Sequence, residues 1–172
     1  LNAGEHRSAT FTAMNPIARV PVLELDDGRF LAESRAICSY LESLYPEPNL
    51  MGVDAEERAF IEMADRQVEL TLLAAVANHV RHSHPGLLPL ENPQFADYAA
   101  EQGKRMVAAA ALFDQLLAKR PWMAGDRFTI ADITAFCGLE FARLVKFRPA
   151  DAGLVHLADW RERVAERPSA RL

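Results

Sequence analysis

Residues 19–34 read RVPVLELDDGRFLAES, and their pattern predicts the architecture of the first part of the chain. Two short apolar runs, residues 22–25 and 30–32, flank an Asp-Gly pair, which is typical of a β-hairpin. From Ser34 onward the apolar residues recur at helical spacing, and prolines end that pattern near Tyr45. The stretch therefore predicts a hairpin followed directly by a helix.

A hairpin with one helix is too small to form a stable sheet layer by itself. The residues before the hairpin offer only one short helix, around Phe11 and Met14. We therefore expect at least one further strand and one further helix to precede Leu1 in the complete protein.

The sequence changes character after a linker at residues 46–52, and the remainder is predicted to be helical. Apolar stripes predict a long helix over residues 54–82 and a second over residues 94–119. Further helices are predicted to begin near Thr129 and near Leu154. The expected class is α+β, with an N-terminal domain at residues 1–47 and an all-helical domain at residues 54–172.

The helix near Thr129 has a clear start signal. Thr129 and Asp132 have the spacing of a capping box, in which each side chain bonds to the main chain of the other. Phe128 and Ile133 have the spacing of a hydrophobic staple. We interpret these residues as structural and give them no catalytic role.

Composition excludes several classes of protein. The 172 residues include 19 Lys and Arg against 24 Asp and Glu, a net charge of −5, which argues against a nucleic-acid or anionic-membrane partner. No apolar run is long enough to span a membrane. Cys38 and Cys137 are too few for a disulfide framework, so we expect a reducing, cytoplasmic location and two core thiols.

Several motifs together resemble one known family. They are residues 4–6 (GEH), 15–16 (NP), 19–23 (RVPVL), 33–37 (ESRAI) and 125–132 (GDRFTIAD), with Trp160 and the later Arg167-Pro168. This set resembles the cytosolic glutathione S-transferase family. Residues 79–86 and 141–146 are similar to a fungal and bacterial, theta-like subset of it. The resemblance implies a partial thioredoxin-like domain lacking its first strand and helix, then a helical-bundle domain, in a homodimer.

The resemblance also implies a glutathione site. It consists of His6, Arg19, Val20, Pro21, Glu33 and Ser34. The Val20–Pro21 bond would be cis, so that Val20 pairs with the cysteinyl unit of glutathione. Ser34 opens a helix, where free N–H groups favour an anion such as the γ-glutamyl carboxylate. The alternatives are a plain turn proline, a Ser34 that only caps its helix, and exposed polar residues at His6 and Arg19.

The thiol of glutathione needs a residue that activates it by lowering its pKa. In most of the family this residue lies in the segment expected before Leu1. Within this chain the candidate is His82, at the end of the long helix. The histidines there could instead be structural, or bind zinc, although no carboxylate or Cys completes an obvious zinc set, and we predict no metal. We expect Arg66, His79 and Ser83 to line the pocket for the electrophile.

The predicted function is transfer of the glutathione thiolate to a small electrophile, in detoxification, with glutathione as co-substrate. Two alternatives stay open at this point. One is a glutathione-dependent isomerase or dehalogenase on the same fold. The other is a non-catalytic binding or regulatory module. Fold alone does not separate them.

Overall fold

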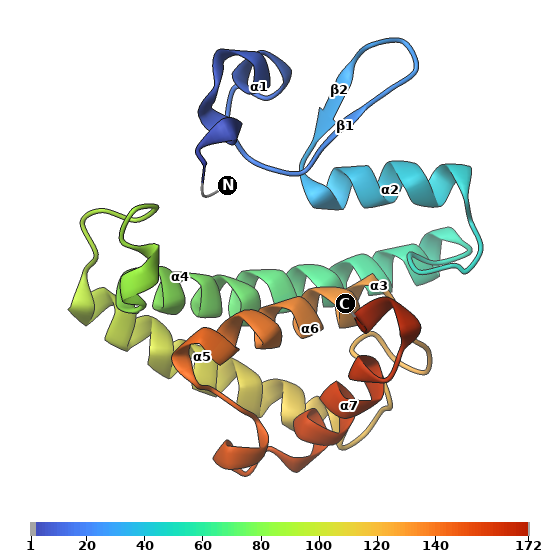
Figure 1. The fold of residues 1–172 in the computed structure, drawn as a ribbon. Helices are drawn as coiled ribbons and strands as arrows, with labels where there is room; N and C mark the ends of the chain where they lie inside the picture. Colours follow the sequence, from blue (N-terminus) through green and yellow to red (C-terminus); the bar gives the residue numbers. More distant parts are fainter. Residues whose placement is uncertain (1–2, 172) are drawn as a thin grey trace. The chain divides into compact units, whose positions relative to one another are not determined.

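The computed structural model describes residues 3–171, which divide into two compact units (Figure 1). The first unit extends to Leu50 and the second begins at Met51. This division falls within the segment predicted to be a linker, because the prolines there interrupt regular structure.

The first unit has the predicted α+β composition. It contains a 3₁₀ turn η1 (Glu5–Arg7), helix α1 (Ala9–Met14), strands β1 (Val22–Glu24) and β2 (Phe30–Ala32), and helix α2 (Ser34–Leu44). The short helix expected at Phe11 and Met14 is α1, and Ser8 caps it by accepting the N–H of Phe11.

The predicted hairpin is confirmed. Strands β1 and β2 pair antiparallel, with Val22 opposite Ala32 and Glu24 opposite Phe30. The loop between them contains Gly28 at φ +80°, a conformation that favours glycine. The Asp27 carboxylate accepts the Arg29 N–H at 3.0 Å and so fixes the loop.

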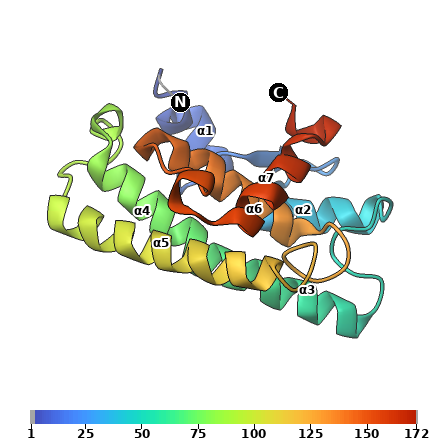
Figure 2. The same ribbon diagram turned by 90° about the horizontal axis from the view of Figure 1, so that it is seen from below.

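The second unit is a helical bundle, as predicted. Its helices are α3 (Ala55–Val68), η2 (Glu69–Leu73), α4 (Ala74–Ser83), η3 (Pro85–Leu87), α5 (Ala96–Leu117), α6 (Ile130–Ala142), η4 (Arg143–Val145), η5 (Ala150–Ala152), α7 (Val155–Ala165) and η6 (Pro168–Ala170). Helix α5 lies along α4, while α6 contacts α3 and α4, and α7 contacts α5 (Figures 1 and 2).

The long helix predicted over residues 54–82 is present, but it has an interruption. Asp54 caps its start by accepting the N–H of Glu57 at 2.8 Å. The segment η2 is π-helical and joins α3 to α4. A π-helical turn inserts one extra residue, which rotates the buried face, and spacing alone did not predict it.

The core of the helical unit contains a buried carboxylate. Asp132 is fully buried, and the predicted capping box with Thr129 is present. Its carboxylate also accepts the Met123 N–H at 2.9 Å and the Trp160 indole N–H at 2.8 Å. Burial raises the pKa of Asp132, and these hydrogen bonds oppose that rise. One side chain thus joins the start of α6 to the preceding loop and to α7.

The prediction that both cysteines are core thiols is wrong. Cys137 is exposed and Cys38 is only partly buried. The buried stripe of α6 runs through Ala135, Leu139 and Ala142, and Cys137 lies off that stripe. Partial burial of its sulfur and the Glu140 charge raise the pKa of Cys137, so the thiol stays protonated.

None of the helices within residues 3–171 combines the length and the apolarity needed to cross a bilayer.

Candidate functional site

The hairpin register brings two of the predicted motifs together. Val22 pairs with Ala32 as the last pair of the ladder, so the residues just before β1 and just after β2 lie at the same end of the hairpin. Val20 and Pro21, which precede β1, therefore lie at the end of the hairpin where Glu33 and Ser34 begin α2 (Figure 1). The Val20–Pro21 bond is cis, as predicted.

At this end of the hairpin, the main-chain N–H and C=O of Val20 are free to bond to a ligand. Val20 is 49% exposed, and within residues 3–171 its N–H and C=O make no hydrogen bond. An extended peptide can pair with such groups as an additional strand.

The Ser34 side is the start of an eleven-residue helix. Glu33 occupies the N-cap position and Ser34 is the first helical residue, so Ser34 is not the cap itself. No side chain caps this helix start, which leaves first-turn N–H groups for a ligand. Glu33 has φ +69°, a strained conformation for a non-glycine residue that costs about 1–3 kcal/mol. Such strain is concentrated at functional sites.

His6 and Arg19 complete the predicted set in the first unit. Arg19 directly precedes Val20, is exposed, and makes no ion pair with any residue that the structure describes. His6 lies on η1 and is half-buried, and its buried Nδ1 has no hydrogen-bond partner in the described chain. A buried nitrogen without a partner is costly, which favours a bound group that supplies one.

The predicted electrophile residues do not all lie together. His79 and Ser83 are on the last turns of α4, where the Ser83 hydroxyl donates to the His79 carbonyl at 2.6 Å. Arg66 lies on α3 and pairs with Glu69. His79 is thirteen positions after Arg66, which corresponds to about 20 Å along the helix. Arg66 is therefore distant from the α4 residues.

The neutral rings of His79 and His82 on α4 differ in which nitrogen carries the proton. The Nδ1 of His79 lies 2.8 Å from the Ala99 carbonyl oxygen, so Nδ1 donates and the neutral ring has its lone pair on Nε2. The Nδ1 of His82 accepts the Phe95 N–H at 3.3 Å, so the Nε2 of its neutral ring carries the proton. That Nε2 lies 3.9 Å from a Glu91 carboxylate oxygen.

His82 also has a clear structural role. Its ring packs against Tyr98 edge to face, with centroids 5.1 Å apart. With the bond to Phe95, the N-cap residue of α5, this contact holds the start of α5 against α4. The zinc alternative gains no support, since no three His, Cys, Asp or Glu side chains within residues 3–171 group as a metal site.

Comparison with known proteins identifies the family. Residues 1–49 match the family model of the glutathione S-transferase N-terminal domain, and residues 72–168 match that of the C-terminal domain. Glutathione S-transferase 2 of Saccharomyces cerevisiae is 38% identical over 169 residues, which cover 98% of this chain and 72% of the yeast protein. The chain belongs to the glutathione S-transferase family.

Solved structures agree with this membership. The crystal structure of a glutathione S-transferase domain-containing protein from Marinobacter aquaeolei VT8 has a TM-score of 0.90 at 44% identity, covering 98% of this chain and 82% of that one. The crystal structure of Gtt2 from Saccharomyces cerevisiae has a TM-score of 0.89 at 38% identity, covering 98% of this chain and 81% of that one. The predicted likeness to a fungal and bacterial subset of the glutathione S-transferases is confirmed.

Sequence reasoning missed the role of Asn15, which appeared only in the Asn-Pro pair of the family motifs. In this glutathione S-transferase chain Asn15 is 3% exposed. Its Nδ2 donates to the Arg19 carbonyl at 2.8 Å, and its Oδ1 accepts the Ile17 N–H at 3.1 Å. Asn15 therefore fixes the loop that carries Arg19 and Val20. An Asn before Pro was the available signal, because Asn side chains commonly bond to the main chain of their own turn.

Proposed function

We propose that this chain is a glutathione transferase that joins the thiolate of glutathione to a small electrophilic substrate. The observation that carries the proposal is the antiparallel hairpin, because the segment before β1, with its cis Val20–Pro21 bond, and the uncapped start of α2 after β2 are at the same end of it. In the reaction a sulfur–carbon bond forms to the electrophile, which releases a leaving group or accepts a proton.

The charges of glutathione are complementary to the proposed ligands. Glutathione has two carboxylates, one ammonium and one thiol. Ser34 and the N–H groups of the first turn would bind the γ-glutamyl carboxylate, with Glu33 near the ammonium. Val20 and Pro21 would bind the cysteinyl unit, and His6 with Arg19 the glycine carboxylate. Members of the family take glutathione as co-substrate, which supports this assignment.

The reaction also requires that the thiol be ionised. A free thiol has a pKa of about 8.5, so little thiolate is present at neutral pH. We propose the end of α4 as the part of this chain that contributes to ionisation. The protonated Nε2 of His82 can orient a water by donating to it, whereas the lone pair on the Nε2 of His79 can accept a proton.

The proposal is tested by titrating glutathione into the protein by calorimetry and following thiolate absorbance at 240 nm. We expect Ser34→Ala to weaken binding about tenfold, because a charge-assisted hydrogen bond is lost. The matched control is Ser43→Ala on the same helix, whose hydroxyl donates only to the Tyr40 carbonyl, and it should bind like wild type.

The outcomes separate the functions. Binding that depends on Ser34, with a thiol that ionises near neutral pH and conjugates an electrophile, supports the transferase. Binding without ionisation or turnover would contradict it and indicate a non-catalytic module. Loss of ionisation in His82→Ala or His79→Ala, with binding retained, would assign the step to that residue. The relatives named above do not favour the isomerase or dehalogenase alternative.

We further propose that the protein is a cytoplasmic homodimer with a role in detoxification. Phe60 and Met63 lie three residues apart on α3 and are 55% and 48% exposed, which supports a buried apolar interface. Light scattering tests this, with Phe60→Glu expected to shift the mass from dimer to monomer. A monomeric wild type would contradict it.

A further inference from the structure

The imidazole ring of His79 on α4 lies against a position of α5 that has no side chain. Helix α5 lies along α4 (Figures 1 and 2). A Cβ atom added at Gly103 would lie 3.1 Å from Cε1 and 3.2 Å from Nδ1 of the ring. These separations are shorter than an ordinary van der Waals contact. Because every residue other than glycine carries a Cβ atom, any substitution at position 103 would push the ring away from α5.

The absent side chain also keeps a main-chain acceptor of α5 accessible. The carbonyl oxygen of Ala99 lies 2.8 Å from Nδ1 of His79. Within helix α5 this carbonyl accepts the N–H of Gly103, four residues later, and its second lone pair remains for the ring. Helical side chains point back toward the N-terminus, so a side chain at position 103 would lie over the Ala99 carbonyl. Glycine at this position is therefore what allows the ring to dock there.

This bond fixes which ring nitrogen can take up a proton. A carbonyl oxygen only accepts, so Nδ1 of His79 carries the proton and Nε2 has the lone pair. Within the described part of the chain the ring makes no other hydrogen bond and no ion pair, so Nε2 is free. His82 differs, because its Nδ1 already accepts the Phe95 N–H and its Nε2 carries the proton. His79 is therefore the histidine of α4 whose neutral ring is ready to accept a proton.

We propose that Gly103 is a positioning residue that holds His79 as the proton acceptor for the glutathione thiol. This inference rests on the transferase reaction proposed above. The S–H bond breaks, its electron pair stays on sulfur as the thiolate, and the proton passes to Nε2 of His79, directly or through one water. The ring becomes an imidazolium, and its Nδ1–H bond to the Ala99 carbonyl becomes charge-assisted and therefore stronger. The proton then passes to the leaving group, to the adduct or to solvent.

The test is the Gly103→Ala variant, with the ring nitrogens of His79 observed by nitrogen NMR. Alanine is favoured over glycine inside a helix, so we expect the variant to fold. The wild-type spectrum should show a protonated Nδ1 and a lone pair on Nε2. Gly103→Ala should lose the protonated Nδ1, because its ring cannot reach the Ala99 carbonyl.

Activity is measured as conjugation of glutathione to 1-chloro-2,4-dinitrobenzene, whose chloride the thiolate displaces. In Gly103→Ala, kcat should fall about tenfold, because the proton acceptor is displaced. The Kd of glutathione, measured by calorimetry, should stay at the wild-type value, because the residues proposed to bind it are unchanged.

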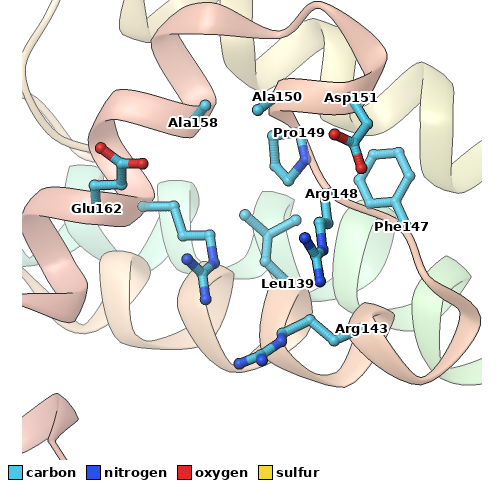
Figure 3. A pocket seen from close by; sticks show the side chains of 10 residues that line it. Leu139, Arg143, Phe147, Arg148, Pro149, Ala150, Asp151, Ala158 and Glu162 are labelled. Carbon is cyan, nitrogen blue, oxygen red and sulfur yellow. The ribbon is translucent and has the colours of Figure 1, made fainter.

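Two control variants separate the ring contact from general effects on the helical unit. Gly138→Ala places a Cβ atom of α6 at 3.6 Å from Leu73, which is an ordinary contact, so helix propensity rises as in Gly103→Ala while the His79 ring is not displaced. Glu162→Gln removes a charge on α7 beside a cavity of about 390 Å³, which is lined by the end of α6, the segment after it and α7 (Figure 3). Both variants should keep the wild-type spectrum of His79 and the wild-type kcat.

Failure of this inference can be told apart from failure of the proposed function. A wild type that forms conjugate, with an equal kcat in Gly103→Ala, would overturn the positioning role and leave the transferase reaction standing. So would a His79 spectrum that Gly103→Ala leaves unchanged, or an equal fall of kcat in Gly138→Ala. A wild type that forms no conjugate would instead refute the proposed function and, with it, the role of His79.

Discussion

Asn15 shows how a single side chain can position a binding loop. Its two hydrogen bonds, to the Arg19 carbonyl and the Ile17 N–H, close the turn between α1 and β1. Ala18 within that turn has φ +56°, a conformation that a non-glycine residue keeps only when its surroundings hold it there. The position of Val20 therefore depends on a residue that does not itself have to touch a ligand.

We expect Asn15→Ala to lower the free energy of unfolding by about 1–3 kcal/mol, because two polar main-chain groups lose a partly buried partner. Glutathione affinity should also fall, since the loop would have to be ordered on binding. Asn15→Asp keeps the acceptor for Ile17 but loses the donor to Arg19. Its free energy of unfolding and its glutathione affinity should therefore lie between those of wild type and Asn15→Ala. Urea unfolding and calorimetry measure both effects. Wild-type affinity in Asn15→Ala would refute the positioning role.

At the scale of elements, the start of α6 depends on Asp132. Its carboxylate serves the capping box, the Met123 N–H and the Trp160 indole. We expect Asp132→Ala to lower the midpoint of urea unfolding by the equivalent of about 3 kcal/mol or more, because several buried donors lose their acceptor together. Trp160→Phe removes only one of these bonds, although it also changes packing. A cost for Asp132→Ala no larger than that for Trp160→Phe would contradict the role of Asp132 as a shared acceptor.

The contact between α6 and α7 should depend on pH through Glu140. Arg143 and Arg161 hold its pKa below the value of about 4.3 expected in the unfolded chain. A lowered pKa means that the contribution of Glu140 to stability is present above pH of about 4.3 and is lost as the pH falls through the folded-state pKa.

The stability difference between wild type and Glu140→Gln should therefore shrink as the pH falls from about 6 to about 3. Urea unfolding at a series of pH values measures it. Asp132, whose pKa is raised by burial, is present in both proteins. Its effect on the pH dependence of stability, which is opposite in sign to that of Glu140, therefore cancels in the difference. A difference that stays constant over this range would show that the Glu140 ion pairs add nothing to stability.

At the scale of the whole molecule, the two units differ greatly in burial. Among residues 3–50 only Asn15 and Ile37 are buried, whereas the helical unit contains a continuous apolar core that includes Val76, Ala110 and Leu139. Local opening is easiest where few apolar contacts must be broken.

Hydrogen exchange should accordingly be fast in residues 3–50 and slow in α4, α5 and α6. Saturating glutathione should slow exchange around Val20 and at the start of α2, since a ligand stabilises the form that binds it. Amides near Ala110 serve as the internal control and should not change. Equal protection of both units in the free protein would contradict the difference in burial.

The sequence predicted those features that depend on residues close together in the chain. The hairpin, the helix beginning at Ser34 and the capping box of Thr129 and Asp132 follow from spacing over a few residues, which fixes local dihedral angles and faces. The family followed from the same short motifs. The predicted site around Val20 and Ser34 depends on the register, and the loop between the strands sets that register locally.

The α+β class, the order of the elements and the family thus follow from the amino-acid sequence alone. Three other features follow from the packing of the helices: Trp160 bonds to Asp132, Glu140 joins Arg143 to Arg161, and Cys137 is exposed. Each of these depends on which faces of the helices meet. Helical periodicity shows that a face is apolar but not which partner covers it, because apolar contact is non-directional and polar partners are selected by packing.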